Sequence, residues 1–283
     1  MTLISCRHRH HSYDNIVEND EITNESRKYI HDSGNASEIS YAENDESSIN
    51  IPDSESYLLP IILDNKSNHI IKHKYYVLSY NKAHNTPNWV AWQLTSNHVD
   101  GPIPRSKKFW ADSLLSVENR VDWYEYKESG YDRGHMCPAG DNKWNKLAMY
   151  ECFYMSNMCP QDPALNNGSW KILEESCRQW AVNEGKIYIV CGPIYRKNIQ
   201  HKQIGIDHSI DVPEAFFKVV LSLRKGHEKA IGFLYSNDSK HQNYRDVAKS
   251  IDDIESLTNI DFFHEIPDDL ENKLESSFSI SDW

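Results

Sequence analysis

A group of residues that could carry out chemistry lies in the middle of the 283-residue chain, at Asp132-Arg133-Gly134-His135. An imidazole can act as a general base near neutral pH, and a nearby guanidinium can bind a phosphate group. Gly134 allows a close approach of the backbone, and Pro138 ends a strand that begins before it. We expect Asp132 to hold Arg133 in an ion pair. The group suits attack of water on a phosphate ester beside a cation.

A histidine by itself is more often structural than catalytic, so the assignment of His135 depends on a second group of residues. Asn166, Glu174 and Arg178 follow downstream, in a segment with helical spacing. Glu174 and Arg178 are four residues apart and share a helix face, with Asn166 about 80° away. The oxygen atoms of Asn166 and Glu174 suit Mg²⁺. Alternatively, Asn166 is only a helix cap and Glu174–Arg178 only a surface ion pair.

The elements that must position these residues can be predicted from periodicity and turn chemistry. Aromatic and β-branched runs predict strands, and the polar segment 81–88 predicts a hairpin turn. Helical spacing predicts a helix over 166–185 that ends at Gly185, another over 244–259, and a short one near the end of the chain. The predicted strands are 74–80, 88–95, 151–158, 186–195, 216–223 and 229–235. Strands outnumber helices, which predicts an α+β fold with a mainly antiparallel central sheet flanked by helices.

The charge of the chain divides it into two parts. Residues 1–56 hold twelve acidic and four basic residues, a balance of −8, whereas the remainder of the chain is close to neutral at −4. We expect 1–56 to be an acidic, disordered tail and 57–283 to be the folded domain. Because the acidity lies mostly in the tail, nucleic acid is not excluded as a partner. No apolar run is long enough to predict a transmembrane segment.

The six cysteines form no C-x-x-C pair, which argues against a zinc knuckle. Two interpretations stay open for them: disulfides in an exported protein, or buried free thiols. Near the start, Leu3-Ile4-Ser5-Cys6 looks like the lipobox of bacterial lipoproteins, although only two residues precede it. His8, His10 and His11 form a cluster that is either a solvated patch or an adventitious metal binder.

Taken together, the two groups resemble the DNA/RNA non-specific endonucleases, whose mark is a D-R-G-H box in a ββα-metal finger. The box here is Asp132-Arg133-Gly134-His135, and "PRSKKFWAD" resembles the family's segment with an essential arginine, which would be Arg105. The resemblance covers about residues 57–283. The downstream pattern matches at Ser156-Asn157, Pro160-Gln161, Leu165-Asn166, Gly168, Trp170, Leu173-Glu174 and Arg178.

The resemblance implies a role for each matched residue. His135 would be the general base, and Asn166 the sole direct protein ligand of Mg²⁺. Glu174 would hold the metal through water, and Arg105 would stabilise the transition state. The remaining site residues would support these: Arg133 and Arg178 as phosphate-binding or structural cations, and Asn157 as a further catalytic residue.

The implied function is a Mg²⁺-dependent endonuclease, with Mn²⁺ as a substitute metal. It would cleave double- and single-stranded DNA and RNA with little sequence specificity and leave 5′-phosphate and 3′-hydroxyl ends. Two alternatives stay open: an inactive nucleic-acid-binding protein on a nuclease fold, and a small-molecule phosphodiesterase. A homodimer and an inhibitor or immunity protein are also open. Since such a nuclease endangers its own cell, we expect a bacterial protein that is secreted, periplasmic or lipid-anchored through Cys6.

Overall fold

The computed structural model describes residues 59–63 and 68–283, all within one compact unit, Ser48–Trp283. The acidic tail, its expected boundary at residue 56, Cys6 and the histidine cluster near the start lie outside the described residues.

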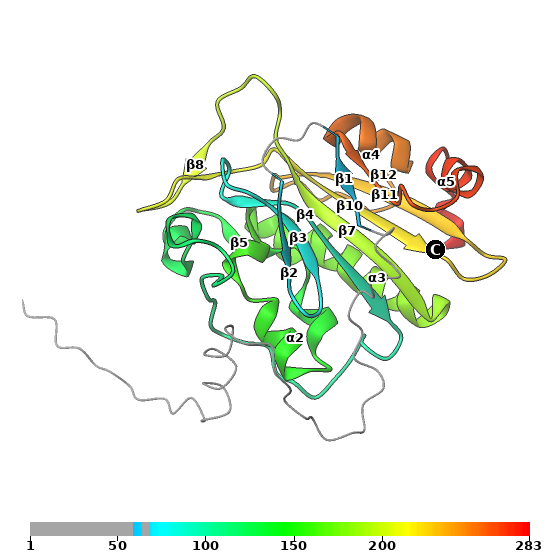
Figure 1. Cartoon of the computed structure of the whole chain (residues 1–283), viewed down its shortest axis with the longest axis horizontal. Helices are drawn as coiled ribbons and strands as arrows, with labels where there is room; N and C mark the ends of the chain where they lie inside the picture. Colours follow the sequence, from blue (N-terminus) through cyan, green and yellow to red (C-terminus); the bar gives the residue numbers. More distant parts are fainter. Residues whose placement is uncertain (1–58, 64–67) are drawn as a thin grey trace, which may run out of the picture. The chain divides into compact units, whose positions relative to one another are not determined.

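The centre of this unit is a seven-stranded sheet in the order β12-β11-β10-β7-β4-β3-β2 (Figure 1). Every neighbouring pair in it is antiparallel, which confirms the predicted sheet. The strands are β2 His69–Lys72, β3 Val77–Asn81, β4 Thr86–Thr95, β7 Lys186–Ile194, β10 Ala215–Ser222, β11 Lys229–Ser236 and β12 Ala248–Lys249.

The sheet separates two hydrophobic cores because successive side chains of a strand point to opposite faces. On β4, Trp92 and Leu94 belong to one core, whereas Trp89 and Ala91 belong to the other. Both faces of the central strands are therefore buried. This explains why β7 and β10 are nearly continuous apolar runs and do not alternate with polar residues.

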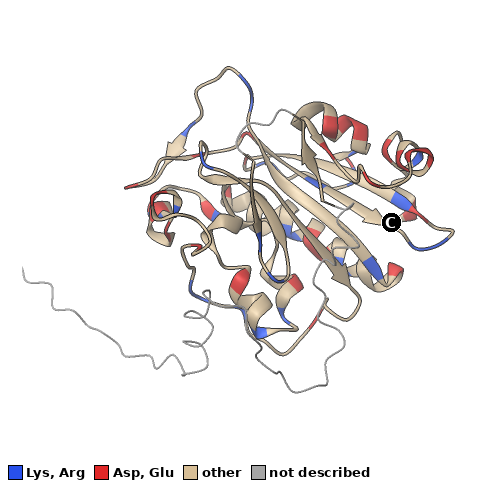
Figure 2. Ribbon diagram, in the orientation of Figure 1, with Lys and Arg blue, Asp and Glu red and all other residues tan. Residues whose placement is uncertain are grey.

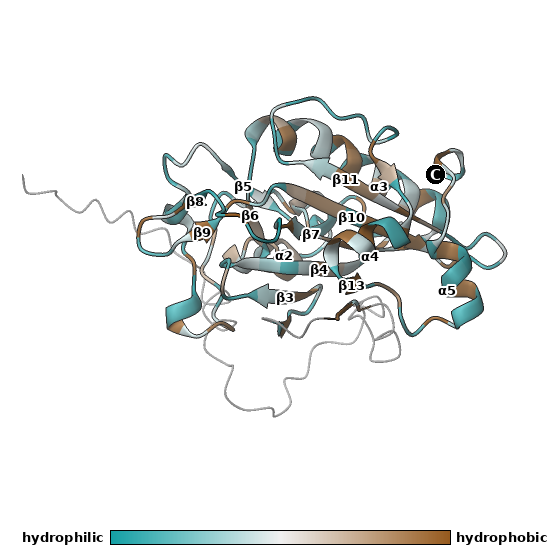
Figure 3. Cartoon of the chain, turned by 90° about the horizontal axis from the view of Figure 1, so that it is seen from above, coloured by the Kyte–Doolittle hydropathy of each residue, from teal (hydrophilic) through white to brown (hydrophobic). Residues whose placement is uncertain are grey.

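Helices cover both faces of the sheet (Figure 3). Helix α3, Trp170–Glu184, contributes Trp170, Leu173, Cys177 and Trp180 to the first core. Gly185 ends it with a φ of +80°, as predicted, because glycine adopts positive φ without a Cβ clash. On the opposite face lie α4, Ile251–Thr258, and α5, Asp268–Glu275. The result is the α+β fold that the pattern of elements predicts.

Shorter elements complete the described chain. Three further antiparallel strand pairs lie outside the central sheet, and a short helix, α2, precedes β6. The pairs are β1 Ile61–Ile62 with β13 Ile260–Asp261, β5 Asp132–His135 with β6 Met158–Gln161, and β8 Gln203–Ile204 with β9 Ile210–Asp211; α2 is Lys146–Glu151. Single turns of 3₁₀ helix lie at Val117–Asn119, Trp123–Tyr126, Ala139–Asn142, Met155–Asn157 and Ile280–Asp282.

Two predicted elements are wrong in place or length. The strand predicted over 151–158 is instead the end of α2, which the Asn145 side chain caps, followed by a 3₁₀ turn; the strand begins only at Met158. The helix predicted over 244–259 begins only after Ser250, whose hydroxyl accepts the Asp253 N–H. The residues before it pair with β11 as β12, so strand pairing overrides their helical spacing.

The charges are unevenly distributed over the elements (Figure 2). Helices α4 and α5 carry acidic residues in their first turns, and they cover the sheet face opposite to α3. Within the described residues, no helix is long and apolar enough to cross a membrane.

The cysteines of the described chain are all buried free thiols: Cys137, Cys152, Cys159, Cys177 and Cys191. Of the two interpretations left open, the structure therefore supports buried thiols for these five. Burial raises the pKa of the Cys137 thiol well above its ordinary value, so it stays protonated and packs as a small apolar side chain.

Candidate active site

The Asp132-Arg133-Gly134-His135 box forms the whole of β5, which pairs with β6 so that Gly134 lies opposite Cys159. A Cβ on Gly134 would lie 2.3 Å from the Gln161 side chain, so only glycine allows the two strands to approach this closely. After β6 the chain enters a π-helical turn, Leu165–Ser169, and then α3. The order strand, strand, helix is the predicted ββα finger.

His135 is held in one orientation with one nitrogen left over. The side chain is only 6% exposed and lies against Phe153 in an edge-to-face contact, with ring centroids 4.7 Å apart. Its ring bonds to the backbone of Arg133, while its buried Nε2 has no hydrogen-bond partner. Nδ1 therefore donates to the Arg133 carbonyl, and Nε2 keeps a free lone pair for accepting a proton.

The surroundings of His135 keep its ring neutral. Burial lowers the pKa of His135 to about 3, and the positive charges of Arg105 and Arg133 act in the same direction. A buried imidazole that cannot easily gain a proton is an acceptor at any pH near neutrality.

Two arginines lie over the aromatic rings that surround His135. The guanidinium carbon of Arg105 lies 5.1 Å from the Phe153 ring centroid, and that of Arg133 lies 4.4 Å from the Phe109 centroid. Arg105 is exposed and close enough to lower the pKa values of both His135 and Glu174. The structure thus brings the loop arginine to the finger, although it lies 27 residues before the box in sequence.

Asp132 does not make the ion pair with Arg133 that we expected. Its Oδ2 accepts hydrogen bonds from the side-chain amides of Asn166 and Asn167, each at 2.8 Å. Arg133 instead donates to the Trp123 carbonyl. Because Asp132 takes the Asn166 Nδ2, the amide is fixed and its Oδ1 is left available as an acceptor or a metal ligand.

Asn166 does not cap the helix in this structure. It lies inside the π-helical turn, where Gly168 adopts a non-helical φ of −112° and ψ of −106°. Turns of this type are rare and occur frequently at functional sites. The alternative interpretation of Asn166 as a helix cap is therefore wrong.

Glu174 and Arg178 lie on one face of α3, but Arg178 pairs with a different acid. Its Nη1 lies 2.9 Å from Oδ1 of the buried Asp141, and the two form an ion pair. Glu174 is half-buried, and burial raises its pKa to about 7 against the opposing pull of Lys218, Arg178 and Arg105. The alternative of a simple surface ion pair between Glu174 and Arg178 does not describe this arrangement.

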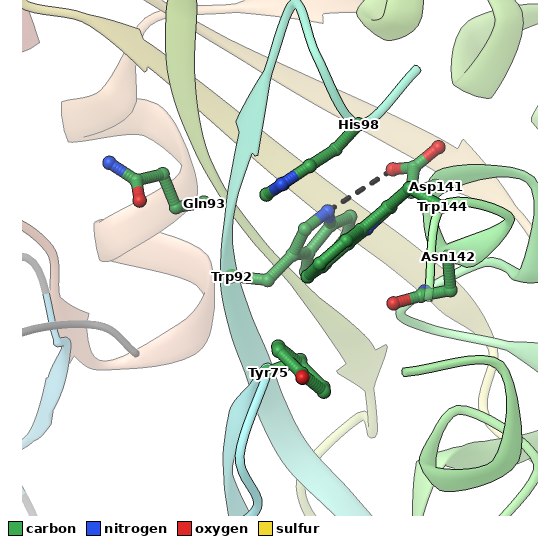
Figure 4. Close-up of a pocket in the computed structure, with 7 residues that line it drawn as sticks. All are labelled: Tyr75, Trp92, Gln93, His98, Asp141, Asn142 and Trp144. Atoms are coloured by element: carbon green, nitrogen blue, oxygen red, sulfur yellow. Dashed lines mark hydrogen bonds between the residues drawn. The ribbon is translucent and has the colours of Figure 1, made fainter. Parts of the chain in front are cut away.

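Lys218 and Asp141 are site-adjacent residues that our sequence reasoning missed. Lys218 lies on β10, is 1% exposed, and its Nζ is 4.4 Å from the Trp170 ring centroid and 5.2 Å from that of Trp92. The Trp92 indole in turn donates to Asp141 Oδ2 at 3.1 Å (Figure 4). A lysine inside the apolar run "FFKVVLSL" was the available signal, because a buried lysine needs a functional or electrostatic reason.

Asn157 is placed differently from the other expected site residues. It is fully buried, and its amide bonds to backbone groups at both sides: it accepts from Cys137 N and donates to the carbonyls of Cys137 and Cys152. All three distances are between 2.8 and 2.9 Å. It therefore positions the segment after His135 without facing the solvent.

Gln161 is a third residue whose importance we missed. It is fully buried opposite Asp132, and neither its amide nitrogen nor its amide oxygen has a hydrogen-bond partner. A buried amide in this state needs a partner from outside the chain, such as water.

Comparisons with known proteins agree with this geometry. The family model for DNA/RNA non-specific endonucleases matches residues 61–269. A nuclease of Nostoc sp. is 33% identical over 74% of this chain and 78% of its own length. The mitochondrial nuclease EXOG of Danio rerio is 34% identical over 66% of this chain, although the match spans only 59% of EXOG.

A solved structure gives the same answer at the level of the fold. A chain from the crystal structure of the EndoG/EndoGI complex superposes with a TM-score of 0.66 and 28% sequence identity, over 71% of this chain and 87% of that one. The box, the Asn166 turn and the fold thus agree with the family match, and the chain belongs to the DNA/RNA non-specific endonucleases.

Proposed function

We propose that this nuclease is a Mg²⁺-dependent endonuclease that cleaves DNA and RNA with little sequence preference and leaves 5′-phosphate and 3′-hydroxyl ends. The observation that carries the proposal is the free lone pair of His135 Nε2, buried beside Arg105. The Asn166 amide, which Asp132 holds with its oxygen free, supports it.

His135 acts as the general base in this proposal. Its fixed ring keeps Nε2 ready to accept the proton of an attacking water. An imidazole with so low a pKa is a weak base. The negative charge of a bound phosphate would offset the charge of Arg105 and raise the pKa of His135 toward its ordinary value.

The residues around Asn166 fit a hard cation. Asn166 Oδ1 would be the direct protein ligand, and Glu174 would hold the metal through water. A bound Mg²⁺ would stabilise negative charge on the leaving oxygen. Mn²⁺, which accepts the same oxygen ligands, is the expected substitute.

The arginines would bind the phosphate. Arg105 is exposed at the edge of the site and would contact the phosphate directly, with Arg133 and Arg178 as supporting cations. All of these groups would contact the phosphate and none would contact the edges of the bases, so the enzyme should tolerate any sequence and accept single or double strands. A homodimer and an inhibitor protein remain proposals, the latter suggested by the EndoG/EndoGI complex. Export from a bacterial cell also remains a proposal, and fractionation of expressing cells tests it.

The test is cleavage of supercoiled plasmid and of a structured RNA, with Mg²⁺, with Mn²⁺ and with EDTA. We expect nicking with either metal, none with EDTA, and products that a ligase can rejoin because their ends are 5′-phosphates and 3′-hydroxyls. His135→Ala should lose at least about 100-fold in rate, the usual contribution of a general base.

His208→Ala is the matched control, since it removes a half-buried histidine that pairs with Glu125 and lies outside the finger. It should keep the parent rate. Intact plasmid with every metal would favour an inactive binding protein instead. Cleavage of a small phosphodiester with intact plasmid and RNA would favour the small-molecule alternative.

A further inference from the structure

A second group of metal-binding side chains lies outside the finger: His84, His201 and Asp211. One ligand atom from each lies within 4.8 Å of the other two. They come from three separate segments, the turn between β3 and β4, the loop after β7, and β9. Three ligands from distant segments seldom converge in this way unless the fold uses them together.

Two of the three side chains are oriented by a second residue. His201 Nδ1 lies 2.9 Å from Glu214 Oε1, and Glu214 Oε2 accepts the Arg196 N–H. With Nδ1 taken by the carboxylate, His201 Nε2 is available as a ligand. Gln203 donates to Asp211 Oδ1 at 2.8 Å, so Oδ2 is the carboxylate oxygen that faces His84. A carboxylate behind a histidine is the usual support of a metal ligand.

The third side chain, His84, is held against the same place. Its Nδ1 lies 2.6 Å from Asp211 Oδ2, and its ring stacks on Tyr195 with centroids 4.0 Å apart. The backbone adds a bond from Asp211 N to the His84 carbonyl. The turn between β3 and β4 is thus fixed to β9 before any ion binds.

We propose that His84, His201 and Asp211 form a binding site for Zn²⁺ or a similar borderline transition metal. Two imidazoles and one carboxylate are a zinc ligand set, whereas Mg²⁺ prefers oxygen ligands alone. Tetrahedral zinc places its ligand atoms about 3.3 Å apart, so binding would draw together atoms that now lie within 4.8 Å, and the His84–Asp211 hydrogen bond would give way to the ion. His84 and Tyr195 also line a cavity of about 540 Å³, so the group lies next to open space.

The ion would tie the long connection between β7 and β10 to the β3–β4 turn. That connection carries β8 and β9 and contributes Arg196 and Lys202 to a pocket that also includes Tyr131, the residue before the box. The three ligands lie on elements other than the turn that holds Asn166, and the proposed role of the ion is structural.

The test is zinc binding by equilibrium dialysis, with Co²⁺ absorption as a second readout of the ligand field. Every protein carries alanine at His8, His10 and His11, so that this cluster cannot compete for zinc. Every protein also carries Asn166→Ala, and excess Mg²⁺ is present. We expect one zinc per chain, lost in His201→Ala and in Asp211→Asn.

His208→Ala is the matched control here also. His208 lies on the same β7–β10 connection as His201 and Asp211, but it pairs with Glu125 and is not a member of the group. This variant should keep the bound zinc. His201→Gln, which keeps the size of the side chain, guards against misfolding and should also lose the metal. Zinc that stays bound after folded His201→Gln and Asp211→Asn, or no zinc in the parent, overturns the proposal.

Discussion

Glu174→Gln should make the metal-free protein more stable at pH 8 while removing its activity. The carboxyl lies half-buried on α3, and burial raises its pKa from 4.5 to about 7. At pH 8 the folded chain must therefore keep a negative charge in a place that disfavours it. Glutamine has nearly the same shape and no charge, so it avoids this cost.

The sign and size of this stability difference follow from the pKa of Glu174 in the unfolded chain, 4.5, and in the folded chain, about 7. Between pH 4.5 and about 7, the folded chain keeps a proton on Glu174 that the unfolded chain has released. The free energy of unfolding of the parent therefore falls as the pH rises through this window. From pH 5 to pH 8 the loss amounts to about 2.5 kcal/mol, and Glu174→Gln does not suffer it.

The assay is urea unfolding of both proteins with EDTA and a reductant, at pH 5 and at pH 8. The stability of Glu174→Gln relative to the parent should rise by about 2.5 kcal/mol between these pH values. Subtracting the unfolding free energy of the parent from that of Glu174→Gln at each pH cancels the titration of the groups that both proteins share. These groups include Glu255 and Glu275, whose pKa values are also raised. Glu175→Gln, at an exposed neighbour, should show no such change. A difference that is constant with pH, or that falls, would refute the assigned burial of Glu174.

Three further substitutions test the supports of the site. Asp132→Ala should weaken Mg²⁺ binding by about 10- to 100-fold, because it removes the oxygen that accepts the amides of Asn166 and Asn167; titration of the rate with Mg²⁺ measures this. Lys218→Met should raise the pKa of Glu174 further, and the acid limb of the pH–rate profile should move to higher pH. Asn157→Ala should lower the free energy of unfolding by about 2 to 4 kcal/mol, since three buried backbone groups lose their partner; urea unfolding checks it.

The elements that the sequence predicted well were those with a strong period and a clear stop. Five of the six predicted strands, and a helix that ends at Gly185, are present within a few residues of the expected places. The strand predicted over 151–158 was wrong because α2 runs to Glu151 and a turn follows, from which Phe153 packs against His135. Local composition did not distinguish that packing from a strand.

The site residues were predictable as types but not as partners. The box and the spacing of Asn166, Glu174 and Arg178 predicted the candidate site, and the structure brings Asp132 of the box into contact with Asn166. That Asp132 would hold Asn166 and not Arg133, and that Arg178 would pair with Asp141, depends on contacts over 34 and 37 residues. Such pairings are set by the tertiary fold, and they cannot be predicted from the local sequence around either partner.

In the proposed mechanism, the position of Arg105 makes the basicity of His135 depend on whether substrate is bound. In the free enzyme, this exposed cation over Phe153 helps to keep the pKa of His135 low. A nucleic-acid strand brings its own negative charge to the same guanidinium and cancels that influence. The imidazole then gains basicity at the moment when a scissile bond is next to it. Burial remains the larger cause of the low pKa, so a bound phosphate would restore only the part of the basicity that Arg105 removes.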